Sequence, residues 1–189
     1  MNKEVKVSME LRSEQQLWRN FVLGDEKAFE MLYTKFHDAL YNYACGITQD
    51  VELAAESVQD LFIKLWRNHQ NLAQPASPKH YLFRAIRNII YNKQQQHRRI
   101  LYVGDRQHLD ELSPATYTED VQFFNALPLS VSMQTNMEKL TSKQREALYL
   151  YFVEDFSYRE LALHFNIKVE GAYKLVYRAL EALKQVFNT

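Results

Sequence analysis

The sequence is poor in residues that interrupt helices and in residues that cross-link chains. Its 189 residues include four glycines, four prolines and one cysteine. So few turn-forming residues disfavour a turn-rich all-β fold. A single cysteine excludes an intramolecular disulfide and a multi-cysteine metal site. Cys45 stands among apolar residues, so we interpret it as a small buried hydrophobe and not as a nucleophile.

Long apolar runs and catalytic motifs are also absent. No stretch is long and apolar enough to span a membrane, and the N-terminal residues carry no secretory signal. We therefore expect a cytoplasmic protein without direct membrane insertion. The six histidines are scattered, and neither a phosphate-binding glycine loop nor a nucleophile with a base is present. An enzyme is not expected, and neither is a metal or cofactor.

Net charge is zero, but the charges are unevenly distributed. Residues 79–106 are rich in lysine and arginine and contain one acid, Asp105, whereas residues 107–127 carry acids and no lysine or arginine. Because the local field attracts phosphate, a basic segment can bind nucleic acid in a neutral protein.

Helix-forming residues dominate, and apolar residues recur at spacings of three and four. These features predict an all-α protein of two small helical domains joined by a linker. The expected divisions are a flexible tail (1–10), a four-helix domain (11–99), a linker (100–127) and a helix-turn-helix domain (128–189).

Residues that cap or end helices mark the helix boundaries of the first domain. A short helix is expected near 17–23, and Gly24-Asp25 separates it from the next. Gly46 is expected to end this second helix, near Ala44. The third follows Asp50. The fourth runs from Pro78, after the cap Ser77, to about His97.

In the second domain, two capping boxes mark helix starts: Thr141 with Gln144, and Ser157 with Glu160. They predict helices over 142–153 and 158–165. A final helix is expected over 169–187, and a shorter one before Leu140.

Residues 157–180 have the pattern of a helix-turn-helix. Leu161 and Phe165 form an apolar face, Ala162 allows close helix approach, and Asn166 suits a left-handed turn position. Charged and tyrosine side chains on the last helix would then face outward, where they can meet phosphates or base edges. Gly171, near the start of this helix, would let the backbone approach DNA closely. The alternative is an ordinary helical hairpin with a solvated face.

The basic fourth helix is less specific. Its arginines and lysines, with Tyr81, Phe83 and Tyr91 between them, suit a nucleic-acid strand bound by charge and stacking. A solvated helix with some aromatics in the core explains the same pattern equally well.

Three segments stand out when the chain is taken as a whole: GDEKAFEMLYTKF with ELAAESVQDLFIKLW, YLFRAIRNIIYNKQQQHRR, and the stretch from Leu140 to Lys184. Together they resemble the extracytoplasmic-function (ECF) branch of the sigma-70 family of RNA polymerase sigma factors. The resemblance implies a region 2-like first domain and a region 4-like second domain. It also implies an alternative sigma factor that directs core polymerase to specific promoters, recognises their minus-thirty-five and minus-ten elements and helps melt the latter.

The resemblance also assigns residues to three sites. Core polymerase is expected at Gln59, Asp60, Phe62, Ile63, Leu65 and Trp66. The minus-ten element is expected at Asn68, His69, Lys79, His80, Arg84, Arg87 and Asn88. The minus-thirty-five element is expected at Lys168, Glu170, Gly171, Tyr173, Lys174, Tyr177 and Arg178. Family members commonly carry lysine and arginine where this chain has Tyr173 and Leu175, so a changed promoter preference is expected.

The implied partners are core RNA polymerase, through its β′ clamp coiled coil and β flap, and promoter DNA, both double- and single-stranded. A membrane-bound anti-sigma factor is a further implied partner, and the free protein is expected to be a monomer. Two alternatives are a helix-turn-helix regulator that acts independently of core polymerase and a pure interaction protein such as an anti-sigma factor. The QDLFIKLW segment and the two basic elements argue against them.

Overall fold

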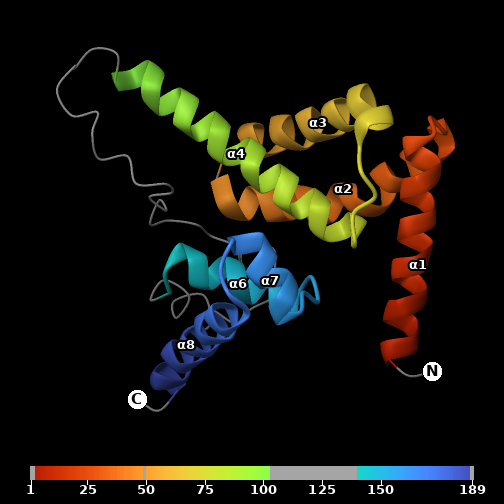
Figure 1. The fold of residues 1–189 in the computed structure, drawn as a ribbon. Helices are drawn as coiled ribbons and strands as arrows, with labels where there is room; N and C mark the ends of the chain where they lie inside the picture. Colours follow the sequence, from red (N-terminus) through yellow and green to blue (C-terminus); the bar gives the residue numbers. More distant parts are fainter. Residues whose placement is uncertain (1–2, 49, 103–139, 188–189) are drawn as a thin grey trace. The chain divides into compact units, whose positions relative to one another are not determined.

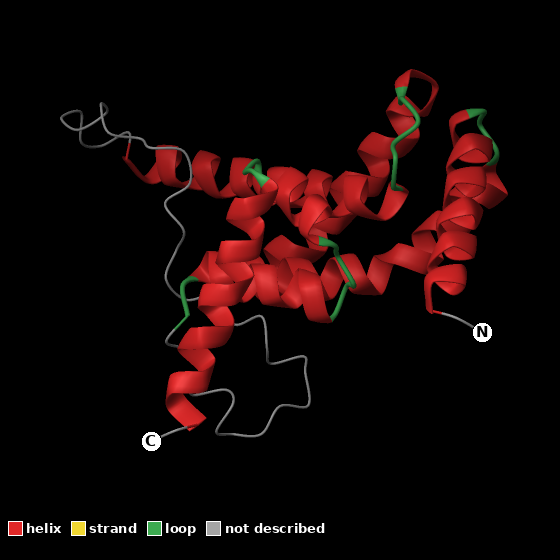
Figure 2. Ribbon diagram, turned by 60° about the horizontal axis from the view of Figure 1, so that its bottom comes forward, coloured by secondary structure: helices red, strands yellow, loops and turns green. Residues whose placement is uncertain are grey.

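The computed structural model describes residues 3–48, 50–102 and 140–187 (Figure 1). Within these residues the chain is helical with short connections and has no strand, which confirms the all-α prediction (Figure 2). The helices are α1 (Lys3–Val22), α2 (Glu26–Thr48), α3 (Val51–Asn68), the 3-10 turn η1 (His69–Asn71), α4 (Pro78–Tyr102), α6 (Ser142–Phe152), α7 (Tyr158–Phe165) and α8 (Val169–Phe187). Across this described part, no helix is apolar over a length that would cross a bilayer.

The chain divides into two compact units, residues 1–44 with 52–89 and residues 45–51 with 90–189. The predicted domain boundaries remain predictions, because most of the expected linker lies outside the described residues. The short helix expected before Leu140 lies outside them too.

The junction between α1 and α2 lies at Gly24-Asp25, as predicted from the sequence. Gly24 adopts a positive φ of 91° at the end of α1. Asp25 then caps α2, since its Oδ1 accepts hydrogen bonds from the backbone N–H groups of Lys27 (2.9 Å) and Ala28 (3.2 Å). The prediction that Gly24-Asp25 separates the first two helices is therefore confirmed.

Other boundaries differ from the prediction. α1 begins at Lys3 and not near Leu17, so helix occupies most of the expected tail, where no glycine or proline interrupts it. α2 continues through Gly46 to Thr48, so Gly46 does not stop the helix. Gly46 is buried, and packing around it offsets the roughly 1 kcal/mol helix penalty of glycine. α4 extends to Tyr102.

The core of the first unit is formed by apolar side chains of α2, α3 and α4. Trp18 and Phe21 of α1 are fully buried as well. At the start of α4, the Ser77 hydroxyl accepts a 3.4 Å hydrogen bond from the His80 backbone N–H, as expected for an N-cap. Buried core residues include Leu32, Phe36, Leu40, Tyr43, Leu53, Ala54, Val58, Leu61, Leu82 and Ile86.

In the second unit, both predicted capping boxes are present, at Thr141 and at Ser157. α7 packs against α8, and α6 packs against both. Asn166 ends α7 with φ 52° and ψ 51°, the left-handed conformation that asparagine tolerates. The helix-turn-helix prediction is thus confirmed at its turn.

A buried polar pair joins α6 to α7. His164 Nε2 lies 3.0 Å from Glu146 Oε1, and both side chains are almost fully buried. Breaking a buried pair of this kind leaves one polar group without its partner, at a cost of about 3–5 kcal/mol if the group is charged. His164 therefore has a structural role.

Candidate polymerase and promoter interfaces

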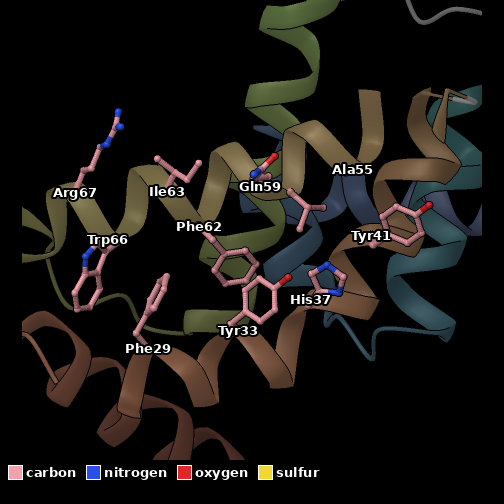
Figure 3. A pocket seen from close by; sticks show the side chains of 11 residues that line it. Phe29, Tyr33, His37, Tyr41, Ala55, Gln59, Phe62, Ile63, Trp66 and Arg67 are labelled. Atoms are coloured by element: carbon pink, nitrogen blue, oxygen red, sulfur yellow. The ribbon is translucent and has the colours of Figure 1, made fainter. Parts of the chain in front are cut away.

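An open groove of about 590 Å³ lies between α2 and α3 (Figure 3). α2 contributes one row of rings spaced four residues apart: Phe29, Tyr33, His37 and Tyr41. A spacing of four places side chains on one helix face. α3 contributes Ala55, Val58, Gln59, Phe62, Ile63, Trp66 and Arg67.

Ring contacts between the two helices form the floor of the groove. Phe29 lies 5.0 Å from Trp66, and Tyr33 lies 4.8 Å edge-to-face from Phe62, measured between ring centroids. Tyr33 is nevertheless 42% exposed and Ile63 is 40% exposed. A contiguous apolar surface that stays open to solvent is typical of a protein-binding site.

Four of the six residues expected to bind polymerase line this groove: Gln59, Phe62, Ile63 and Trp66. Asp60 is half-buried and does not line it. Leu65 is only 5% exposed and does not line the groove, so its role is core packing and its assignment to a contact surface is not supported. The α2 row and Arg67 were not predicted from the sequence, although the four-residue spacing of the rings was a visible signal.

Two residues expected at the minus-ten element, Asn68 and His69, make contacts within the first unit. Asn68 Nδ2 donates a 2.9 Å hydrogen bond to the Lys64 carbonyl. The His69 ring stacks on Trp66 at 5.2 Å and lies 6.2 Å from Phe21, and its Nδ1 lies 2.7 Å from the Trp66 carbonyl oxygen. A direct DNA contact from His69 would have to compete with this packing.

The other minus-ten residues lie on α4. Arg84 and Asn88, one turn apart, are exposed, whereas Arg87, His80 and Lys79 are half-buried. The Lys79 ammonium lies 5.9 Å from the Phe83 ring centre. Of these five residues, Arg84 and Asn88 are therefore the most exposed to solvent.

The aromatic residues between these basic residues do not form one stacking surface. Phe83 is fully buried and packs 5.1 Å from Tyr43, so for this residue the alternative interpretation, an aromatic side chain in the core, holds and stacking on a strand does not. Tyr81 is partly exposed, but it lies 5.1 Å edge-to-face from Trp18.

The residues expected at the minus-thirty-five element lie on α8 and the residue before it. Five of them are exposed along α8 and form what we call the α8 stripe: Glu170, Tyr173, Lys174, Tyr177 and Arg178. Lys168 is exposed in the turn. Gly171 differs, because a Cβ there would meet the Ile167 side chain at 3.6 Å. Gly171 therefore faces the turn and lies next to the α8 stripe, not within it.

Tyrosines from three helices form a cluster at one edge of this stripe. Tyr158 of α7 lies 5.0 Å from Tyr151 of α6 and 5.3 Å from Tyr173 of α8, and Tyr173 lies 6.4 Å from Tyr177. A hydrogen bond with Tyr151, together with burial, raises the pKa of Tyr158 to about 12. The cluster presents hydroxyls and ring faces and includes Tyr173, a position where the resemblance implies a basic residue.

Comparison with known proteins identifies the class. Residues 32–100 match Sigma-70 region 2, and residues 130–183 match Sigma-70, region 4. The chain is 23% identical over 158 residues to the ECF RNA polymerase sigma factor SigM of Bacillus subtilis (strain 168), covering 83% of this chain and 93% of SigM. It is 25% identical over 160 residues to the RNA polymerase sigma factor SigZ of the same organism, covering 84% and 86%.

Two solved structures share the fold. One is the sigma factor RpoE in complex with the anti-sigma factor NepR from Bartonella quintana, with a TM-score of 0.62 and 23% identity over 86% of this chain and 98% of that chain. The other is CnrH in complex with the cytosolic domain of CnrY, with a TM-score of 0.63 and 17% identity over 93% and 97%.

The chain therefore belongs to the sigma-70 family and is a sigma factor of the ECF type. Regions 2 and 4 of the family are both present, in that order. A protein of this class is an alternative sigma factor that directs RNA polymerase to promoters.

Proposed function

We propose that the groove between α2 and α3 is the surface that holds core RNA polymerase, through the helices of the β′ clamp coiled coil. A helix bound in an apolar groove is anchored by a few large side chains. Tyr33, Ile63 and Trp66 suit this role, because they offer ring and branched apolar surface at an accessible site. Arg67 at the edge can pair with an acidic residue of the partner.

The minus-ten element is proposed to meet the loop after η1 and the exposed face of α4. Arg84 and Asn88 supply a cation and an amide one helical turn apart. Such groups bind the backbone and base edges of a strand that has left the duplex. Extruding a base costs a few kcal/mol, so a loop that holds the base is needed to favour melting.

The minus-thirty-five element is proposed to hold α8 in its major groove. Lys174 and Arg178 are placed for phosphates or guanine edges, and Tyr173 and Tyr177 for hydrogen bonds or contacts with thymine methyl groups. The exposed stripe on the second helix of a helix-turn-helix is the observation that carries this assignment.

An anti-sigma factor is proposed as a regulatory partner, since a solved structure that shares the fold is a sigma factor in complex with an anti-sigma factor. Such a partner would compete with polymerase if it covered the α2–α3 groove. The β flap is a second proposed polymerase contact, for the second unit. Because polymerase and promoters lie in the cytoplasm, we place the protein there and expect a monomer when it is free.

In vitro transcription tests the function as a whole. Sigma-free core polymerase from a related bacterium would be mixed with this protein and pooled genomic promoter fragments. Discrete transcripts that require the protein are expected, and aligned start sites would define both elements. If the folded protein forms no complex with core polymerase, the proposal is wrong, and a separate DNA-binding regulator becomes the better interpretation.

A further inference from the structure

α1 holds the loop between η1 and α4 at several points. Gln15 Nε2 donates a 2.9 Å hydrogen bond to the Ala76 carbonyl. Trp18 Nε1 donates a 3.2 Å hydrogen bond to the Ala73 carbonyl. Between these two points, Gln74 Nε2 donates a 3.3 Å hydrogen bond back to the Gln15 carbonyl. Side chains about sixty residues away in sequence therefore fix residues 73–76.

Trp18 also connects the loop to the helices on either side of it. Its ring is fully buried and packs edge-to-face against Tyr81 in the first turn of α4, with 5.1 Å between centroids. It packs in the same way against Phe21, at 5.5 Å, and Phe21 in turn lies 6.2 Å from His69 at the start of η1. One side of α1 thus contacts η1, the loop and the first turn of α4.

An ion pair anchors α1 to a second helix. Lys35 Nζ of α2 lies 3.0 Å from Glu14 Oε1, and Glu14 is largely buried. Glu14, Gln15 and Trp18 are consecutive or one turn apart on α1. The donors to the loop are therefore carried by a helix that is itself fixed to the body of the unit.

The loop contacts point to pre-organisation more than to overall stability. The Gln15 and Gln74 bonds are exposed to solvent, so they contribute little to the free energy of unfolding. The Gln15 and Trp18 bonds do restrict the backbone carbonyls on both sides of Gln74-Pro75, those of Ala76 and Ala73. A binding loop held in its bound conformation loses less entropy when it engages its ligand.

We infer that Gln15 and Trp18 are positioning residues for promoter opening: through the Ala76 and Ala73 carbonyls they hold residues 73–76 in the conformation that accepts a base of the minus-ten element. This inference rests on the proposed function, because it assigns that loop to the minus-ten element. Neither side chain needs to touch DNA. α1 would then control which minus-ten sequences are opened, through a loop that is distant in sequence.

Gln15→Ala tests the inference, and Gln16→Ala is its matched control. Gln16 is the neighbouring residue of the same type, and its Nε2 bonds Asn20 Oδ1 within α1 at 3.0 Å. Trp18→Phe adds a variant that keeps a ring but removes the N–H donor. Opening would be monitored in full holoenzyme, with a fluorescent adenine analogue in the minus-ten element of a promoter found by the transcription experiment, and of the same promoter with single minus-ten substitutions.

The expected result is a roughly three- to tenfold loss of discrimination between the matched and substituted promoters for Gln15→Ala, the size of one lost hydrogen bond. Affinity for core polymerase and the unfolding midpoint should stay at wild-type values, and Gln16→Ala should leave discrimination unchanged. Trp18→Phe should reduce discrimination in the same direction.

Two outcomes overturn the inference. If Gln15→Ala lowers opening equally on all promoters, or leaves discrimination intact, the α1 contacts serve stability alone. A wild-type holoenzyme that transcribes but ignores every minus-ten substitution would refute the assignment of the loop to this element, and with it the inference. That result is distinct from failure of the sigma function, in which no transcript appears at all.

Discussion

The α2–α3 groove and the α8 stripe are both exposed, but they are built in opposite ways. The groove needs two helices and is lined mainly by rings and aliphatic groups, with the Phe62 ring in contact with both Phe29 and Tyr33. The stripe belongs to one helix and is lined by charges and tyrosine hydroxyls. The groove suits a protein helix, whose binding depends on shape and apolar area. The stripe suits a phosphate backbone, whose binding depends on charge and salt.

This difference predicts that the two surfaces respond to different perturbations. Damage to the groove should reduce polymerase binding with little dependence on salt. Damage to the stripe should reduce promoter binding and alter its salt dependence.

The largest effect is expected from a charge in the groove. Ile63→Glu places a carboxylate on an apolar surface that must lose water on binding, so affinity for core polymerase should fall roughly a hundredfold. The control is Met31→Glu, which adds the same charge at an exposed apolar residue of α2 outside the groove. Fluorescence anisotropy with labelled protein measures both. Equal losses for the two variants would show that the groove has no special role.

A smaller effect is expected from neutralising the stripe. Lys174→Ala with Arg178→Ala should weaken holoenzyme binding to the promoter roughly tenfold at moderate salt and reduce the slope of log affinity against log salt by about 2. Arg19→Ala with Lys27→Ala removes the same two charges from exposed sites of the first unit and is the control. An unchanged slope in the stripe variant would contradict the assignment.

Adding a positive charge at the tyrosine cluster should change the salt dependence of promoter binding in the opposite direction. Tyr173→Lys introduces a positive charge of the type that the family resemblance implies near this position, so the salt slope should increase in magnitude by about 1. Preference among minus-thirty-five sequences should change at the same time, whereas Tyr173→Phe, which removes only the hydroxyl, should leave the slope unaltered. Binding of both variants to a set of substituted promoters at several salt concentrations tests this.

The smallest effect is a pH dependence that arises from Tyr158 in the second unit. The pKa of Tyr158 is raised from an ordinary 10.0 to about 12, so the folded state keeps its proton while the unfolded state loses it. This contribution to stability is complete below pH 10 and is lost as pH rises toward 12. Tyr158→Phe should therefore show a shallower loss of stability over that range in thermal unfolding. Identical slopes for variant and wild type would contradict the shift.

Features set by neighbouring residues were predictable from the sequence. The two capping boxes, the Asp25 cap and the left-handed Asn166 each depend on a few adjacent side chains, and all are present. The α8 stripe was predictable for the same reason, because one helical period separates its buried side from its exposed side.

Features set by tertiary contacts were not predictable in this way. Helical periodicity alone could not show that Phe62, which is only 4% exposed, also lines the groove, because a residue of the core face can reach an open surface. Gly46 did not end α2, since burial outweighs local propensity. The Gln15 contact with Ala76 spans 61 positions and leaves no local signal.

Site-specific photo-crosslinking tests the central claim most directly. A crosslinking amino acid would replace Ile63 in the groove or Tyr177 in the stripe, and each protein would be assembled with core polymerase and a labelled promoter. We predict that position 63 crosslinks to the polymerase β′ subunit and that position 177 crosslinks to DNA upstream of the start site. Crosslinks from position 63 to DNA alone, or from position 177 to polymerase alone, would contradict the assignment of the groove to polymerase and of the stripe to promoter DNA.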